Sequence, residues 1–270
     1  MNIKRLVKAV AVSLVLATSA SFSTAATITV GGVVFDPNSP FDFLSKGGLF
    51  ERVISQIGDT AAGFGLINNI NEVTESSQFC PNCQLTYTFG GFRLIDADPA
   101  HLLFDGGFVN FFVQDKSAAG YTAYDATKPQ GNAADGTLWL SLAGHTDTRF
   151  GYSGPGTLFG KIDSGTLGSG TERGQGGGLL DVTGGLAKAN IDTNTQMDSF
   201  GKFADLNFTS TFLPTQQAAI DAGAPRLTGN ATFTGNSNAV PEPATLLLLG
   251  AGLAGLGFAG KRRKTAVVAA

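Results

Sequence analysis

Cys80 and Cys83 are the two cysteines of the chain, in the sequence CPNC. This spacing supports a disulfide, a thiol–disulfide redox pair or half of a zinc site. The cysteines of a redox pair lie at the start of a helix, whereas apolar and polar residues alternate from Gln84 onward, as in a strand. Zinc needs two further ligands, and the only histidines, His101 and His145, lack the spacing of a zinc finger. We therefore expect a disulfide that stiffens the turn before this strand.

His145 lies in the segment GHTDTRF, with Asp147 two residues further along. A histidine with a carboxylate to orient it is the arrangement of a general base. No Gly-x-Ser-x-Gly sequence is present to supply a nucleophile. The sequence therefore favours a loop histidine without catalytic function, and it favours the same for His101.

Acidic residues recur in close pairs, which makes them candidates for calcium binding or glycoside hydrolysis. The pairs are Asp36 and Asp42, Asp96 and Asp98, and Asp192 and Asp198. Ca²⁺ takes several carboxylate and carbonyl oxygens, and none of these segments has the order of an EF-hand loop. Glycosidases need two carboxylates about 5–10 Å apart, a separation that sequence spacing alone does not establish. We expect turn residues and no cofactor, with Ca²⁺ as the open alternative.

The elements that must position these side chains are predicted to be strands. Short apolar runs alternate and are separated by glycine-rich turns, as in QLTYTFGGFRLI at 84–95 and GTLWLSLAG at 136–144. Apolar residues have helical spacing only over Leu49–Gly58, where we expect one short helix. No repeat period of a solenoid is present. The fold predicted is all-β, a single β-sandwich-like domain with one short helix.

The segment from Ala244 to Gly260 contains no charged residue. As a helix its roughly 17 residues would be about 25 Å long, which is the short end of what spans a bilayer. A basic cluster follows at once and is retained on the cytoplasmic side; it consists of Lys261, Arg262, Arg263 and Lys264. We therefore expect a C-terminal transmembrane helix that serves as a temporary anchor.

The residues before this span form the motif Val240, Pro241, Glu242 and Pro243. The two prolines hold the chain extended and leave Glu242 accessible. Motif, apolar span and basic cluster together resemble the PEP-CTERM sorting signal of Gram-negative bacteria. The resemblance implies processing by exosortase, a membrane-embedded transpeptidase-like enzyme, and delivery to the surface or the extracellular matrix, beside exopolysaccharide production. The tail at 265–270 is longer than the resemblance leads us to expect.

The N-terminal segment, MNIKRLVKAVAVSLVLATSASFSTAA, has the order of a secretory signal peptide. Lys4, Arg5 and Lys8 precede an apolar stretch, and small residues follow it up to Ala26. Export through the Sec translocon and cleavage by signal peptidase are therefore expected. Both ends of the chain require the same topology, with the body of the protein outside the cytoplasm.

The body of the chain is acidic. The two ends hold seven of the 18 bases and one of the 21 acids, so residues 27–239 carry 11 bases and 20 acids, a net charge of −9. Nucleic acid binding needs a basic face, so this class of partner is excluded.

These features divide the chain into five parts. They are a signal peptide (1–26), a β-rich extracytoplasmic domain (27–234), a linker (235–239), the sorting signal (240–264, with its span at 244–260) and a cytoplasmic tail (265–270). We expect an exported, non-enzymatic protein, held transiently in the inner membrane and then associated with exopolysaccharide or biofilm matrix. The alternative is a secreted carbohydrate-active enzyme or a calcium-dependent glycan-binding module.

Overall fold

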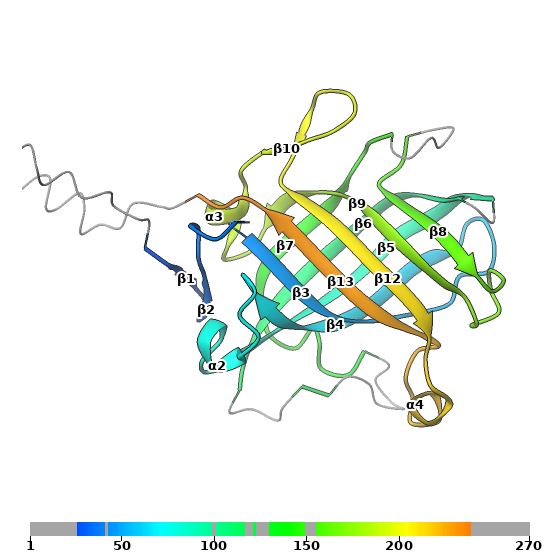
Figure 1. Ribbon diagram of the computed structural model, residues 1–270, viewed down its shortest axis with the longest axis horizontal. Helices are drawn as coiled ribbons and strands as arrows, with labels where there is room; N and C mark the ends of the chain where they lie inside the picture. The colour runs from blue at the N-terminus through cyan, green and yellow to red at the C-terminus, as the bar shows by residue number, and fades with distance from the viewer. Residues whose placement is uncertain are drawn as a thin grey trace, which may run out of the picture.

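The computed structural model of the protein describes residues 26–40, 43–98, 101–116, 121–122, 130–148 and 155–238 (Figure 1). Most of the predicted signal peptide lies outside these ranges, as do the predicted transmembrane helix, the basic cluster and the cytoplasmic tail. Among the described residues, no helix has the length and apolar character needed to cross a bilayer.

Eight antiparallel strands form a closed barrel. They are β3 (Phe43–Glu51), β4 (Thr60–Ile70), β5 (Cys83–Asp98), β6 (His101–Asp115), β7 (Thr137–His145), β9 (Arg173–Gly184), β12 (Leu206–Pro214) and β13 (Leu227–Gly235). Each strand pairs with the next in space, and β12 pairs with both β13 and β9, which closes the sheet. A further strand, β8 (Leu158–Ser164), continues the line of β7 between β6 and β9.

The remaining elements lie at the ends of the barrel. β1 (Ile28–Val30) pairs with β2 (Val33–Phe35), and β10 (Gln196–Met197) pairs with β11 (Phe203–Ala204). The short helices α2 (Ser76–Phe79), α3 (Lys188–Ile191) and α4 (Gln217–Asp221) occur in connections between strands. Figure 1 shows the β10–β11 hairpin rising from the start of β12, beside the end of β13.

The all-β prediction is confirmed, but the β-sandwich is wrong. A sandwich would consist of two separate sheets, each with unpaired edge strands. Here Leu206 to Phe212 of β12 pair in register with Leu180 to Gly174 of β9, so neither strand has a free edge. The apolar pattern of one buried face is the same in both architectures, so the pattern did not distinguish them.

The helix predicted over Leu49–Gly58 is also wrong. Residues up to Glu51 belong to β3, where Phe50 pairs with Thr228 of β13 and with Phe64 of β4. Residues 52–59 form a turn, in which the Asp59 carboxylate accepts the N–H groups of Ser55 and Gln56. The two neighbouring strands therefore override the local helical spacing.

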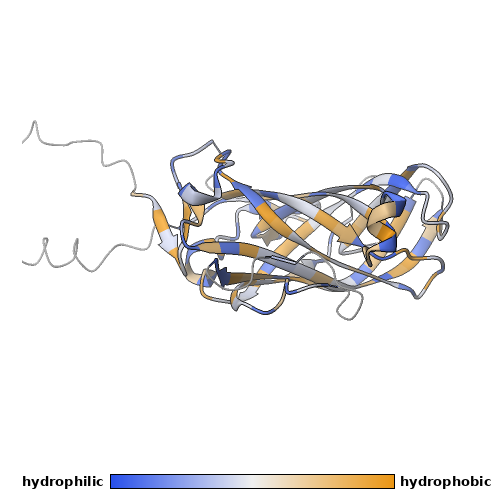
Figure 2. Ribbon diagram, turned by 90° about the horizontal axis from the view of Figure 1, so that it is seen from below, coloured by the Kyte–Doolittle hydropathy of each residue, from blue (hydrophilic) through white to orange (hydrophobic). Residues whose placement is uncertain are grey.

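Large aromatic side chains fill the barrel. Tyr87, Phe111 and Phe233 are buried, with ring centroids 4.9 to 5.8 Å apart. Trp139 packs on Phe111 and donates its Nε1–H to the Val30 carbonyl at 2.8 Å, which ties β1 to the barrel. Figure 2 shows the alternation of apolar and polar positions along the strands that places these rings inside.

Glycines make room for these rings. A Cβ atom on Gly65 would collide with the Gly48 carbonyl and lie 2.6 Å from the Tyr87 ring and hydroxyl. The same hydroxyl donates a hydrogen bond of 2.7 Å to that carbonyl. A Cβ atom on Gly48 itself would meet no atom within 4 Å. Of two glycines on adjacent strands, only Gly65 is therefore required by packing.

We expect Gly65→Ala to lower the free energy of unfolding by about 1–3 kcal/mol, because the added methyl group forces the strands or Tyr87 to move. Gly48→Ala is the matched control and should change stability by no more than about 0.5 kcal/mol. Urea unfolding followed by near-ultraviolet circular dichroism measures both. Equal effects of the two substitutions would contradict this account of the packing.

Candidate functional site

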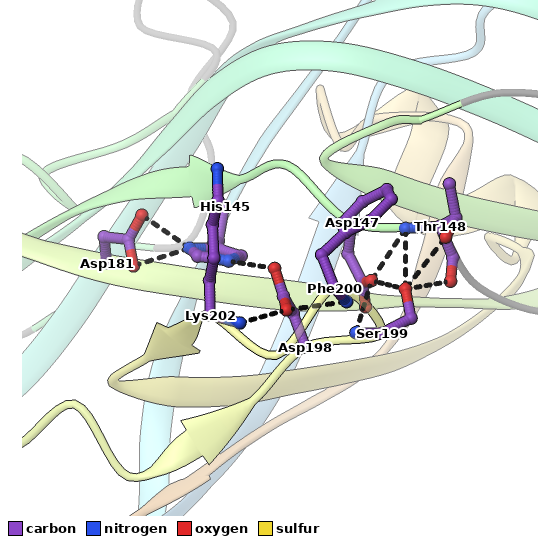
Figure 3. Close-up of polar contacts among 8 residues, drawn as sticks. All are labelled: His145, Asp147, Thr148, Asp181, Asp198, Ser199, Phe200 and Lys202. Carbon is purple, nitrogen blue, oxygen red and sulfur yellow. Dashed lines mark hydrogen bonds and ion pairs between the residues drawn. The ribbon is translucent and has the colours of Figure 1, made fainter.

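His145 stands between two carboxylates on the outer face of the barrel (Figure 3). Its Nδ1 lies 2.9 Å from each carboxylate oxygen of Asp181, on the neighbouring strand β9. Its Nε2 lies 3.0 Å from Oδ2 of Asp198, in the β10–β11 hairpin. An ionised carboxylate only accepts hydrogen bonds, so this arrangement favours the imidazolium form of the ring, in which both nitrogens donate.

The charges of this cluster favour the ionised forms. Burial by itself disfavours a charged imidazole, but the hydrogen bonds to Asp198 and Asp181 and their negative charges outweigh it and raise the pKa of His145. Burial likewise opposes ionisation of Asp198. The hydrogen bonds from His145 and from the N–H groups of Lys202 and Phe200 prevail and lower the pKa of Asp198.

Asp147, the partner expected for His145, is used elsewhere. Its Oδ1 accepts the Thr148 N–H at 2.7 Å, the Ser199 N–H at 2.9 Å and the Ser199 hydroxyl. The actual partners, Asp181 and Asp198, are 36 and 53 residues away from His145 in sequence. Only the pairing of β7 with β9 and the folding of the hairpin onto them bring these groups together, so no sequence spacing indicated them.

This arrangement suits a structural contact. Both nitrogens of His145 are engaged by carboxylates, so neither can accept a proton from a substrate. The Ser199 hydroxyl donates to a carboxylate and not to an imidazole, so it is not an activated nucleophile. The cluster instead pins the β10–β11 hairpin to the barrel wall.

The other residues singled out from sequence lie apart. Cys80 and Cys83 form a disulfide between α2 and β5. Asp36 accepts the Asn38 N–H at 2.8 Å, as a turn residue does, and Asp42 lies outside the described residues. Within the described ranges, no group of three or more His, Cys, Asp or Glu side chains is suited to hold a metal ion.

A groove of about 850 Å³ crosses the outer face of four adjacent strands. Two rows of paired residues run across it, and each row takes one residue from β13, β12, β9 and β8 in turn. The rows are Asn230, Thr211, Gln175 and Lys161, and Thr232, Thr209, Gly177 and Phe159. His101 lies at the margin of the same groove.

The lining of the groove is almost neutral. Its polar side chains are hydroxyls and amides, and no Asp or Glu is among the described lining residues. Lys161, which contributes a positive charge, lies 3.2 Å from the Asp163 carboxylate. No signal in the sequence marked this groove, because its members come from four separate segments.

A pair of carboxyl groups faces a cavity inside the barrel. Glu51 and Glu172 both line a space of about 50 Å³ that is otherwise mostly apolar. Glu172 is 2% exposed; its Oε1 accepts the Gly168 N–H at 2.6 Å, and its Oε2 has no hydrogen-bond partner in the described part of the chain. Burial, and next the charge of Glu172, raise the pKa of Glu51 to about 7. Charge is therefore costly here, and one proton is retained up to near-neutral pH.

Ionisation of His145 makes stability depend on pH. The pKa of His145 is higher in the folded state than its ordinary value of 6.5. The stability that its ionisation contributes is therefore fully present below pH 6.5, and it is lost as the pH rises through the pKa of the folded state. We expect the free energy of unfolding of His145→Gln, measured in urea, not to show this decline above pH 6.5. Proton NMR of the ring should give a midpoint above 6.5, and a midpoint below it would contradict the cluster.

Glu51 also makes the protein less stable as the pH rises, but in a lower pH range. Its folded pKa of about 7 lies above the ordinary value of 4.5, so stability is lost as the pH rises from 4.5 to about 7. The loss is at most about 3 kcal/mol. We expect Glu51→Gln to be more stable than the unmodified protein at pH 8 and to show a flatter profile between pH 4.5 and 7. An unchanged profile would show that burial does not raise the pKa of Glu51.

Comparison with known proteins identifies one feature of the chain. A family model, the PEP-CTERM protein-sorting motif, matches residues 239–264. No curated protein and no solved structure matches the chain. The match begins directly after Asn238, the last residue that the structure describes. The chain therefore carries a PEP-CTERM sorting motif and is an exported protein that exosortase recognises and that is transiently anchored in the membrane.

Proposed function

We propose that this exported protein is a non-enzymatic surface or matrix component and that its barrel holds exopolysaccharide in the outer groove. The observation that carries the proposal is that the two rows across β13, β12, β9 and β8 present five hydroxyl or amide side chains, those of Asn230, Thr211, Gln175, Thr232 and Thr209. Neighbouring strands are about 4.8 Å apart, so four strands present a strip about 14 Å wide. A strip of this width suits a short stretch of a hydroxyl-rich polymer.

The groups in the groove are available to a ligand. Within the described part of the chain, the side chains of Gln175, Thr209, Thr211, Asn230 and Thr232 make no hydrogen bond to the protein. Each hydroxyl both donates and accepts, and so does each amide, which matches the mixed character of sugar hydroxyls. In the second row Gly177, which has no side chain, lies between Thr209 and Phe159.

A neutral polymer suits this groove better than an anionic one. The body of the protein carries excess negative charge, which repels polyanions at long range. The one lysine of the two rows already has Asp163 beside it. Phe159 is 2% exposed, so it offers little face for stacking, and binding would depend on hydrogen bonds repeated along the polymer.

Two observations favour a binding protein over the carbohydrate-active enzyme. Glycoside hydrolysis needs two carboxyl groups at the substrate, and the described lining of the groove contains none. Both ring nitrogens of His145 are engaged. Export through the Sec translocon, removal of residues 1–26 and a final location on a Gram-negative cell surface or in its matrix belong to the same proposal.

The test compares the mature secreted protein with a Thr209→Val/Thr232→Val variant, which removes two paired hydroxyls and keeps the β-branched shape. We expect retention on neutral polysaccharide in affinity electrophoresis to fall about five-fold or more, because each net hydrogen bond contributes about 1 kcal/mol. Thr60→Val, on an exposed strand position outside the groove, is the matched control.

The assay is run on neutral and acidic polysaccharides, with and without Ca²⁺. Equal binding by all three proteins would overturn the assignment of the groove. Turnover of a glycan would overturn the non-enzymatic function, and retention that requires Ca²⁺ would favour the calcium-dependent module.

A further inference from the structure

Large apolar side chains are exposed together at one end of the barrel. Met197, Phe200 and Phe203, all in the β10–β11 hairpin, are 65%, 57% and 50% exposed, and Leu186 before α3 is 51% exposed. We call residues 196–204 the arm. It projects from the body of the barrel, as Figure 1 shows. Apolar side chains gathered on a projecting segment indicate an interaction surface.

The chain leaves the barrel beside this arm. Asn236, the first residue after β13, accepts hydrogen bonds from Thr195 at 3.0 Å and Gln196 at 3.3 Å, at the base of the arm. Two residues later the Asn238 N–H donates to the Asn190 carbonyl of α3 at 2.7 Å. The sorting motif therefore begins at a point that is bonded to the base of the arm and to α3.

The distance from this exit to the membrane is short. The apolar stretch begins at Ala244, six residues after Asn238, and six extended residues reach at most about 21 Å. Whenever the apolar stretch lies in the bilayer, Asn238 lies within about 21 Å of it, so the end of the barrel that bears the arm is the end held near the lipid. The opposite end, which includes the turn at 52–59, is turned away.

We propose that the arm rests on the lipid surface of the anchored precursor, with Met197, Phe200 and Phe203 between the head groups and the acyl chains. Aromatic and long apolar side chains are favoured at that depth. The anchor keeps the arm at a high effective concentration beside the lipid, so a weak affinity is sufficient. Once processing removes the tether, the same weak affinity lets the protein leave.

The cluster around His145 gives the arm a fixed direction. Asp198 accepts one hydrogen bond from His145 and two from the arm's own N–H groups, at Phe200 and Lys202 (Figure 3). Asp147 holds Ser199 next to them. An arm held at both these points, in contact with lipid, sets the height at which Glu242 is presented to exosortase.

The direct test places a tryptophan on the arm of the full-length precursor. Phe200→Trp is reconstituted in vesicles that contain brominated phosphatidylcholine, which quenches tryptophan within the acyl region. The matched control is Ile57→Trp, because Ile57 is 62% exposed in the turn at the opposite end. The emission of the buried Trp139, measured in the unsubstituted precursor, is subtracted from both.

We expect the F200W signal to shift to shorter wavelength and to lose several-fold more intensity to bromine than the I57W signal. Equal quenching of the two probes, or none, overturns the proposal. If F200W emission shifts only as precursor density in the vesicles rises, and bromine has no effect, the arm binds a second copy of the chain, and the lipid assignment is wrong.

A second test measures the consequence for sorting. The triple variant Met197→Ser/Phe200→Ser/Phe203→Ser keeps Asp198 and its hydrogen bonds. In cells with exosortase we expect its unprocessed precursor to persist several-fold longer than that of the Ile57→Ser control. Equal urea midpoints of the two variants exclude misfolding. Processing at the control rate by a folded triple variant overturns the role in presentation, whatever the result for polysaccharide binding.

Discussion

Backbone pairing between β9 and β12 closes the barrel, and the other features of this protein depend on it. Seven residue pairs, from Leu206 with Leu180 to Phe212 with Gly174, join strands that begin more than thirty residues apart in sequence. Closure leaves β9 and β12 without a free edge and encloses the aromatic core. The groove crosses this seam, and Asp181 lies just beyond it on β9. The base of the arm connects to β12 at the same place.

The acidic groups of the barrel have been accommodated in three different ways. Asp198 is satisfied by an imidazolium and two backbone N–H groups, so it remains ionised although its side chain is fully buried. Asp147 is satisfied by backbone and hydroxyl donors. Glu172 has an oxygen without a hydrogen-bond partner in the described part of the chain, and its charge adds to burial in raising the pKa of the neighbouring Glu51. The contacts of Asp198 and Asp147 hold the arm, whereas the Glu51 and Glu172 pair makes the opposite end of the barrel sensitive to pH.

The two ends of the barrel have different roles in this view. One end carries the disulfide, the Trp139 contact to β1, the arm and the exit of the chain toward the sorting motif. The other contains the Glu51 and Glu172 pair and the turn at 52–59. The groove lies between them on the outer wall. Export, anchoring and ligand contact can therefore use separate surfaces of one small domain.

Two properties could be predicted from the sequence alone, namely export with a C-terminal sorting motif and the all-β class of the fold. The sorting motif at 239–264 is contiguous, so its chemistry is visible without folding, and the alternation along 84–95 and 136–144 is a local property of strands. The helix over Leu49–Gly58 failed because a local spacing cannot anticipate the strands that pair on either side.

The choice between barrel and sandwich needed the three-dimensional structure, since both bury one face of each strand and differ in whether the sheet closes on itself, here through the pairing of β9 with β12. For the same reason the sequence did not reveal Asp181 and Asp198 as the partners of His145, nor the two rows of the groove. Their members are distant in sequence and become neighbours only through strand register, which the chain sets when the sheet closes.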